Sequence, residues 1–140
     1  MPIHQLAREE VIHAPPVTPL QDIAGLMRDN RVGSVIITDD DRPVGIITDR
    51  DLAIKAMADG ADPQDHVAGD IMSAEVCTVD ESTGFYESAE TMREHGIRRL
   101  PICNDAGELT GIITADDLTE LLADEMQQIA GVIQSQRQPY

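Results

Sequence analysis

The stretch Gly45–Leu52 reads GIITDRDL, and it returns at Gly111–Leu118 as GIITADDL. Upstream of it, the Met-Arg pair at 27–28 reappears at 92–93, so the similarity extends well beyond one motif. The second copy carries one additional residue, in the turn at 104–107, where a duplicated fold accommodates an insertion most easily. The sequence therefore predicts an internal repeat, with copy one over 2–60, copy two over 67–124, and a C-terminal helix extension and tail over 125–140.

Each copy is predicted to contain a strand, a helix, two further strands and a second helix. Leu20, Ile23 and Met27 recur at the spacing of one helix face. Apolar runs separated by turns rich in Asp, Asn, Pro or Gly predict the strands. The predicted strands are 11–14, 32–37 and 44–47 in copy one and 76–79, 97–103 and 109–113 in copy two, and the second helices begin at Asp49 and Ala115.

One such copy has too few strands to bury both faces of its sheet. The expected fold is therefore of the α+β (mixed α/β) class, with two βαββα repeats packed sheet to sheet about a pseudo-two-fold axis. That arrangement leaves a cleft between the copies, and equivalent loops from each copy line it.

The repeated Thr-x-x-Asp lies where a strand passes into a helix. One interpretation is a capping box, in which Thr and Asp satisfy free backbone N–H groups. The other is a site for a phosphorylated sugar, with the hydroxyl and N–H groups on phosphate and the carboxylate on ribose hydroxyls. Two occurrences after the same Gly-Ile-Ile strand favour the site, because capping does not require that context.

The repeated motif, the segment His95–Ile102 (HGIRRLPI) and the Asp70–Met72 lead-in (DIM) resemble a tandem CBS (cystathionine-β-synthase) domain pair, or Bateman module. The resemblance runs from about Ile3 to Leu122. It implies a non-catalytic regulatory module that binds AMP, ADP, ATP or a related adenosyl ligand between the repeats. It also implies a homodimer that signals through repacking to a protein partner.

Site residues follow from the resemblance by position. Thr48 and Thr114 would face the phosphate, and Asp51 and Asp117 would hold the ribose. The start of each middle strand would border the adenine and phosphates, and the first strand would close the base pocket. These last two groups are Val32, Gly33, Ser34, Ile97, Arg98 and Arg99, and then His13, Ala14, Thr78 and Val79.

Arg98 and Arg99 concentrate positive charge in an acidic chain, and guanidinium groups suit phosphate. The alternative is that they pair with nearby carboxylates. Copy one has Gly33 and Ser34 at the equivalent positions. The two sites are therefore expected to be unequal.

Composition excludes several functions. The chain has 26 acidic and 10 basic residues and a net charge of −16, which repels nucleic acid and anionic membranes. No apolar run approaches the roughly 20 residues that span a bilayer, and no signal peptide precedes the fold, so a cytoplasmic location is expected. The four histidines lack metal-ligand spacing, and no P-loop or nucleophile elbow occurs. No metal, required cofactor or catalysis is expected.

Two features leave alternatives open. Cys77 and Cys103 are expected either as small buried side chains or, on neighbouring strands, as a redox-sensitive pair. The apolar stripe after Leu118 continues to Ile133, which favours either packing on its own domain or a dimer seam. The second functional hypothesis is a structural dimerisation or interaction module whose ligand cleft is vestigial.

Overall fold

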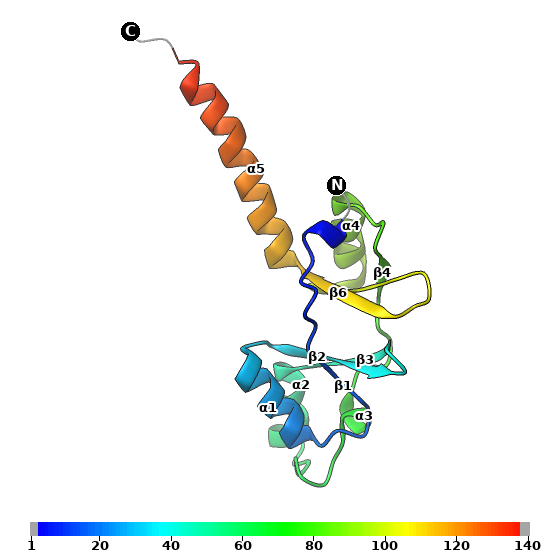
Figure 1. The fold of residues 1–140 in the computed structure, drawn as a ribbon. Helices are drawn as coiled ribbons and strands as arrows, with labels where there is room; N and C mark the ends of the chain where they lie inside the picture. Colours follow the sequence, from blue (N-terminus) through cyan, green and yellow to red (C-terminus); the bar gives the residue numbers. More distant parts are fainter. Residues whose placement is uncertain (1–2, 138–140) are drawn as a thin grey trace.

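The computed structural model describes residues 3–137 and contains two three-stranded sheets with helices. In Figure 1 the two sheets face each other across the middle of the molecule, and the helices lie on their outer sides. This confirms the predicted mixed α/β class and the two-sheet arrangement. None of the helices within 3–137 is long and apolar enough to cross a bilayer.

The helices and strands follow the predicted order in both copies. The first half contains β1 (His13–Ala14), α1 (Leu20–Asn30), β2 (Ser34–Asp39), β3 (Arg42–Thr48), α2 (Asp49–Leu52) and the π-helical η2 (Ala53–Ala58). The second half contains β4 (Val79–Asp80), α4 (Phe85–His95), β5 (Arg99–Cys103), β6 (Leu109–Thr114) and α5 (Ala115–Ser135). Two short helices precede the halves, namely η1 (Ile3–Gln5) and α3 (Ala68–Ile71).

The middle strands β2 and β5 begin two residues later than predicted. Each preceding helix ends in a left-handed residue, Arg31 (φ 55°) after α1 and Gly96 (φ 62°) after α4. The chain needs the next residues to turn back toward the sheet. Residues 32–33 and 97–98 are therefore loops, which frees their backbone and side chains to line a cavity.

The two sheets have the same topology and matching registers. In each, the first strand runs parallel to the middle strand, which pairs antiparallel with the third. Ser34 lies opposite Thr48 in the first sheet, and Arg99 lies opposite Thr114 in the second. The pseudo-two-fold relation therefore places Arg99 where the first copy has Ser34.

Small aliphatic side chains form one core under each sheet, as the near absence of aromatic residues predicts. Val35, Ile37 and Ile47 are fully buried against α1 in the first core. Alternate residues point the other way, into the interface between the sheets. There Ile36 and Pro101 are almost completely buried, and they lie at equivalent positions of β2 and β5.

The segment before each half packs on the opposite half. Ile3, in η1, is fully buried in the second core, and its N–H donates to Thr83 O at 2.9 Å. Ala68, in α3, is fully buried in the first core, and its N–H donates to Thr18 O at 2.8 Å. Figure 1 shows the N-terminal segment beside α4 rather than beside α1. The sequence did not predict this exchange of lead-in segments.

The exchanged segments explain the glycine of the repeated motif. Residues Arg8 and Ile112 form an antiparallel bridge, and Ser73 and Ile46 form the equivalent one. A β-carbon on Gly111 would lie 3.3 Å from both Ala7 Cβ and Arg8 O, and one on Gly45 would overlap the Met72 side chain. Only glycine lets the segment that crosses from the opposite half, at residues 7–8 or 72–73, lie this close to the third strand.

We expect Ile3→Ala to lower the free energy of unfolding by about 2–5 kcal/mol, because it leaves a cavity in the second core. Urea unfolding followed by circular dichroism measures the change. Val17→Ala is the control, since Val17 is 73% exposed and should change stability by less than about 0.5 kcal/mol. Equal stability of the Ile3 variant and the wild type would contradict the burial of η1 against the second half.

Candidate functional site

Both Thr-x-x-Asp corners form capping boxes. Thr114 Oγ1 accepts the N–H of Asp117 at 3.1 Å, and Asp117 Oδ2 accepts the N–H of Thr114 at 2.9 Å. Thr48 and Asp51 make the same two bonds at 3.2 and 2.8 Å. The capping interpretation is therefore correct for the protein without ligand. It leaves ligand binding open, because each capping hydroxyl only accepts and keeps its own O–H to donate.

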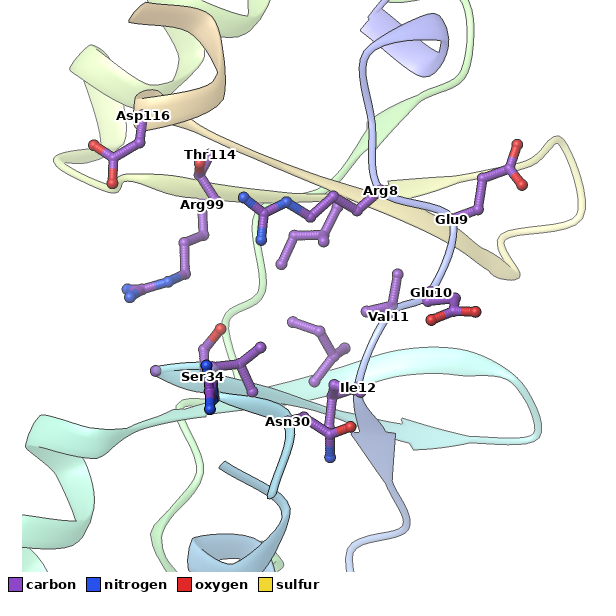
Figure 2. Close-up of a pocket in the computed structure, with 15 residues that line it drawn as sticks. Arg8, Glu9, Glu10, Val11, Ile12, Asn30, Ser34, Arg99, Thr114 and Asp116 are labelled. Atoms are coloured by element: carbon purple, nitrogen blue, oxygen red, sulfur yellow. The ribbon is translucent and has the colours of Figure 1, made fainter. Parts of the chain in front are cut away.

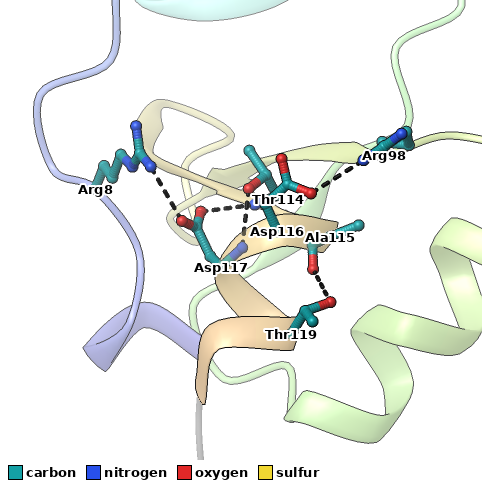
Figure 3. Close-up of polar contacts among 7 residues, drawn as sticks. All are labelled: Arg8, Arg98, Thr114, Ala115, Asp116, Asp117 and Thr119. Carbon is teal, nitrogen blue, oxygen red and sulfur yellow. Dashed lines mark hydrogen bonds and ion pairs between the residues drawn. The ribbon is translucent and has the colours of Figure 1, made fainter. Parts of the chain in front are cut away.

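Two arginines meet carboxylates around the second corner, as Figure 3 shows. Arg8 Nη2 lies 3.1 Å from Asp117 Oδ1, and that carboxylate side chain is only 13% exposed. Arg98 Nη2 lies 3.0 Å from Asp116 Oδ1, in a pair that is largely exposed. The expected alternative, in which arginine pairs with a nearby carboxylate, therefore holds for Arg98.

A cavity of about 640 Å³ opens between the two halves. It combines Thr114 and Ile112 of the second half with the loop at 30–34 of the first half and the crossing segment at 8–12. In Figure 2 the side chains of Arg8 and Arg99 both extend into the space below Thr114, while Glu9 and Glu10 lie on the far side. The cavity is thus composite, with basic groups next to Thr114.

Two smaller cavities lie at the equivalent place by the first corner. One, of about 310 Å³, is lined by Thr48, Arg50 and the loop at 96–99, and the other, of about 420 Å³, is lined by Ile46, Cys77 and His95 among others. Each corner therefore faces the helix-to-strand loop of the opposite copy. This cross-copy pairing differs from a site built within one repeat.

Eight of the predicted site residues line these cavities. They are Thr48, Thr114, Ile97, Arg98, Arg99, Val32, Gly33 and Ser34. Asp51 and Asp117 lie behind the threonines, held by their capping bonds. The structure thus brings together most of the set that the resemblance implies.

The predicted first-strand residues lie elsewhere. Ala14 is buried in the first core, and Val79 packs against the second, because β1 and β4 turn these side chains toward the helices. His13 lines a separate cavity of about 360 Å³ near the hairpin turns, where Nδ1 is 3.3 Å from Thr38 Oγ1. Thr78 is exposed and lines none of the three cavities beside the corners. The residues that border the large cavity instead are Val11 and Ile12, just before β1.

Sequence reasoning missed Arg8 as a site residue. Its partner Asp117 is 109 positions away, so no local pattern connects them. The internal repeat was the one signal that could have identified Arg8. Arg8 precedes β1 as Ser73 precedes β4, and each pairs with a residue next to the glycine of the repeated motif. That signal requires the exchange of segments to be known.

The two cysteines are free and too far apart along the strands to bond. Cys103 lies opposite Asp80 in the β4–β5 pair, whereas Cys77 precedes Asp80 by three residues, or about 10 Å of extended chain. A disulfide needs Cα atoms within roughly 7 Å. Cys103 lies on β5, but Cys77 lies in the segment just before β4, so the two cysteines are not on neighbouring strands as expected. Within residues 3–137, no three His, Cys, Asp or Glu side chains form a group that could hold a metal ion.

A duplicated βαββα unit with exchanged lead-in segments and a composite cavity at each motif corner defines a paired-repeat module. The chain belongs to the CBS domain family, whose model matches residues 3–57 and 68–124.

Individual relatives extend this assignment. An uncharacterised protein of Methanopyrus kandleri is 42% identical over 120 residues, which are 85% of this chain and 61% of that protein's length. Hypoxic response protein 1 of Mycobacterium tuberculosis is 36% identical over 72% of this chain and 71% of its own length. The chain therefore spans less than two thirds of the first of these relatives.

Solved structures share the fold. The crystal structure of Hypoxic Response Protein I with two coordinated zinc ions has a TM-score of 0.78 and 31% identity, over 86% of this chain and 98% of that one. A CBS domain protein from Pyrobaculum aerophilum complexed with AMP has a TM-score of 0.76 and 28% identity, over 84% of this chain and 89% of that one. The similarity covers both halves and therefore includes the interface between them.

Burial raises the pKa of the Cys103 thiol above its ordinary value of 9.0. The folded protein therefore holds this proton more tightly than the unfolded chain does. The contribution is fully present below pH 9 and is lost as the pH rises through the raised value. We expect the free energy of unfolding to fall as the pH rises above about 9, and to fall less steeply in Cys103→Ala. Identical slopes for the two proteins would contradict the expectation.

Proposed function

We propose that the chain is a regulatory module that binds an adenosine ligand, such as AMP, ADP, ATP or a related adenosyl compound, between its two halves and catalyses no reaction itself. The observation that carries the proposal is the composite cavity of about 640 Å³ beside Thr114, with Arg8 and Arg99 extending into it. Cavities of 300–1,000 Å³ are typical of small-molecule sites. The relative complexed with AMP supports the ligand class.

The chemistry of the second corner suits a nucleoside phosphate. The Thr114 hydroxyl, at the N-terminus of the 21-residue α5, can donate to a phosphate oxygen, and Arg99 supplies charge. Asp117 uses one oxygen for its cap and one for Arg8, yet a carboxylate offers about four lone-pair positions. It can therefore accept ribose hydroxyls without giving up the cap. Val32, Ile12 and Ile112 give the cavity apolar walls for the base.

Regulation follows from the composite nature of the site. A ligand between the halves touches the second corner, the loop at 30–34 and the crossing segment at 8–12 at once. Its binding free energy then favours one relative packing of the halves over others. We propose that a partner protein, or the dimer, responds to this change. With a net charge of −16, nucleic acid and membranes are not proposed as partners, and a cytoplasmic location is proposed.

Isothermal titration calorimetry with AMP tests the proposal. We expect saturable binding, and we expect Asp117→Asn to weaken it roughly tenfold or more, because a neutral amide accepts ribose hydroxyls less strongly than a carboxylate does. Asn keeps an oxygen for the Thr114 N–H, so the helix cap survives.

Asp124→Asn is the matched control. Asp124 is an exposed residue of the same helix, and its substitution should leave AMP affinity unchanged. Absence of heat with AMP, ADP, ATP and S-adenosylmethionine would reject the proposed function, and equal effects of the two variants would reject the role of Asp117.

A second candidate function, self-association, rests on α5. The helix extends away from the rest of the protein in Figure 1. Four of its five exposed large apolar residues, all but Val132, follow one another at spacings of four, three and four, as in the seam of a coiled coil. They are Leu122, Met126, Ile129 and Ile133, each between 51% and 63% exposed.

The charges of α5 favour a second copy in antiparallel orientation. All its acidic residues lie between Asp116 and Glu125, and the helix from Met126 onward is uncharged. A parallel pair would place the two acidic halves side by side, whereas an antiparallel pair separates them. The two candidate functions are compatible, since the seam lies beyond the ligand cavity.

We expect the chain to be a homodimer by sedimentation equilibrium and Ile129→Glu to shift it to monomer, because the substitution buries a charge at the centre of the seam. Asp124→Glu is the control and should leave the dimer intact. A monomeric wild type, or a dimer that survives Ile129→Glu, would rule out association through α5.

A further inference from the structure

Arg99 lines cavities at both corners, and its neighbour Arg98 does so too. On the second-corner side Arg99 lines the 640 Å³ cavity with Thr114. On the first-corner side it lines the 310 Å³ cavity with Thr48 and the 420 Å³ cavity with His95. Its Cα lies opposite Thr114 in the β5–β6 pair, but its guanidinium reaches the other half. A β-carbon on Gly33 would lie 3.2 Å from Arg99 Nη2 and 3.3 Å from Asp49 Oδ2.

The guanidinium of Arg99 also lacks a carboxylate partner among residues 3–137. Its neighbours Arg98 and Arg8 are held by Asp116 and Asp117. Among residues 3–137, Arg99 has neither a hydrogen bond nor an ion pair through its side chain. It is half-buried, so its charge is less screened than that of the exposed Arg98 or Arg50. An unpaired cation that lines cavities at both corners can interact with an anion in either.

The first half has no arginine at the position equivalent to Arg99. Ser34 occupies the equivalent position in β2, opposite Thr48, and is almost fully buried. The first corner has Asp49 beside it and Glu75 in its larger cavity, so an anion there needs a nearby cation. Arg50 also lines the smaller first-corner cavity but is exposed, so Arg99 is the half-buried guanidinium that the two corners share.

We propose that Arg99 couples the two clefts negatively: the phosphate of a ligand in one cleft holds Arg99 there and weakens phosphate binding in the other. The inference rests on the proposed function, and it adds how the two sites regulate each other. Coupling free energies between sites typically correspond to affinity changes of about 5- to 150-fold. A ligand without phosphate should not engage Arg99, so its two binding steps should be uncoupled.

Calorimetric titrations with AMP and with adenosine test this on the full chain. We expect the two AMP affinities to differ by roughly tenfold more than the two adenosine affinities do. Arg99→Gln should weaken the tighter AMP step and leave the weaker step nearly unchanged, so that the ratio of the two AMP affinities falls to that found with adenosine. Ser34→Arg, which supplies the missing guanidinium, should narrow the AMP ratio by strengthening the weaker step. Arg93→Gln removes an exposed charge on α4 and is the control for net charge.

The possible outcomes separate the inference from the proposed function. AMP binding with the same ratio as adenosine, or an Arg99→Gln variant that weakens both steps equally, would overturn the coupling and leave the proposed function standing. An AMP ratio that persists in Arg99→Gln would overturn it too, because direct repulsion between ligands would then explain the difference. No binding of either ligand by the wild type would reject both. Thermal unfolding of each variant, expected within a few degrees of the wild type, verifies that the comparison is between folded proteins.

Discussion

The exchange of lead-in segments is the constraint on which the rest of the structure depends. The N–H of Ile3 bonds to Thr83 O, and the N–H of Ala68 bonds to Thr18 O, so each half completes its core with chain that precedes the other half. Two bridges, Arg8 with Ile112 and Ser73 with Ile46, then fix each crossing segment against a third strand. The relative position of the halves, and hence the shape of the cavities between them, follows from these contacts.

The corner motif serves two purposes that need not compete. Thr114 and Asp117 close a capping box at the start of α5, and Thr114 also lines the cavity. The cap fixes the rotamers of both side chains before any ligand arrives, which lowers the entropic cost of binding. The same argument explains why the motif recurs as a unit in both halves. A residue that only capped the helix, or only bound the ligand, would not need both the Thr and the Asp of the motif.

Much of the architecture could be predicted because it is repeated and local. The duplicated Gly-Ile-Ile-Thr motif located both strand-to-helix corners, and the apolar spacing located α1 and α4. The exchange of segments could not be predicted, because the contacts of Ile3 with Thr83 and of Arg8 with Asp117 join distant parts of the chain. The composite cavity depends on that exchange, so its assignment to Thr114 together with the loop at 30–34 was out of reach. Ala14 and Val79 illustrate a smaller difficulty: in a two-residue strand, the direction of a side chain depends on a register that periodicity cannot define.

The position of η1 also bears on how the protein forms during synthesis. Ile3 leaves the ribosome well before Ile113 and Leu118, which belong to the core that buries it. Domains commonly fold from the N-terminus as they are made. Here Ile3 must wait for the second half to be synthesised, so folding of the two halves is completed together. A nascent chain that stalls between them would expose Ile3 and leave the second half without one wall of its interior.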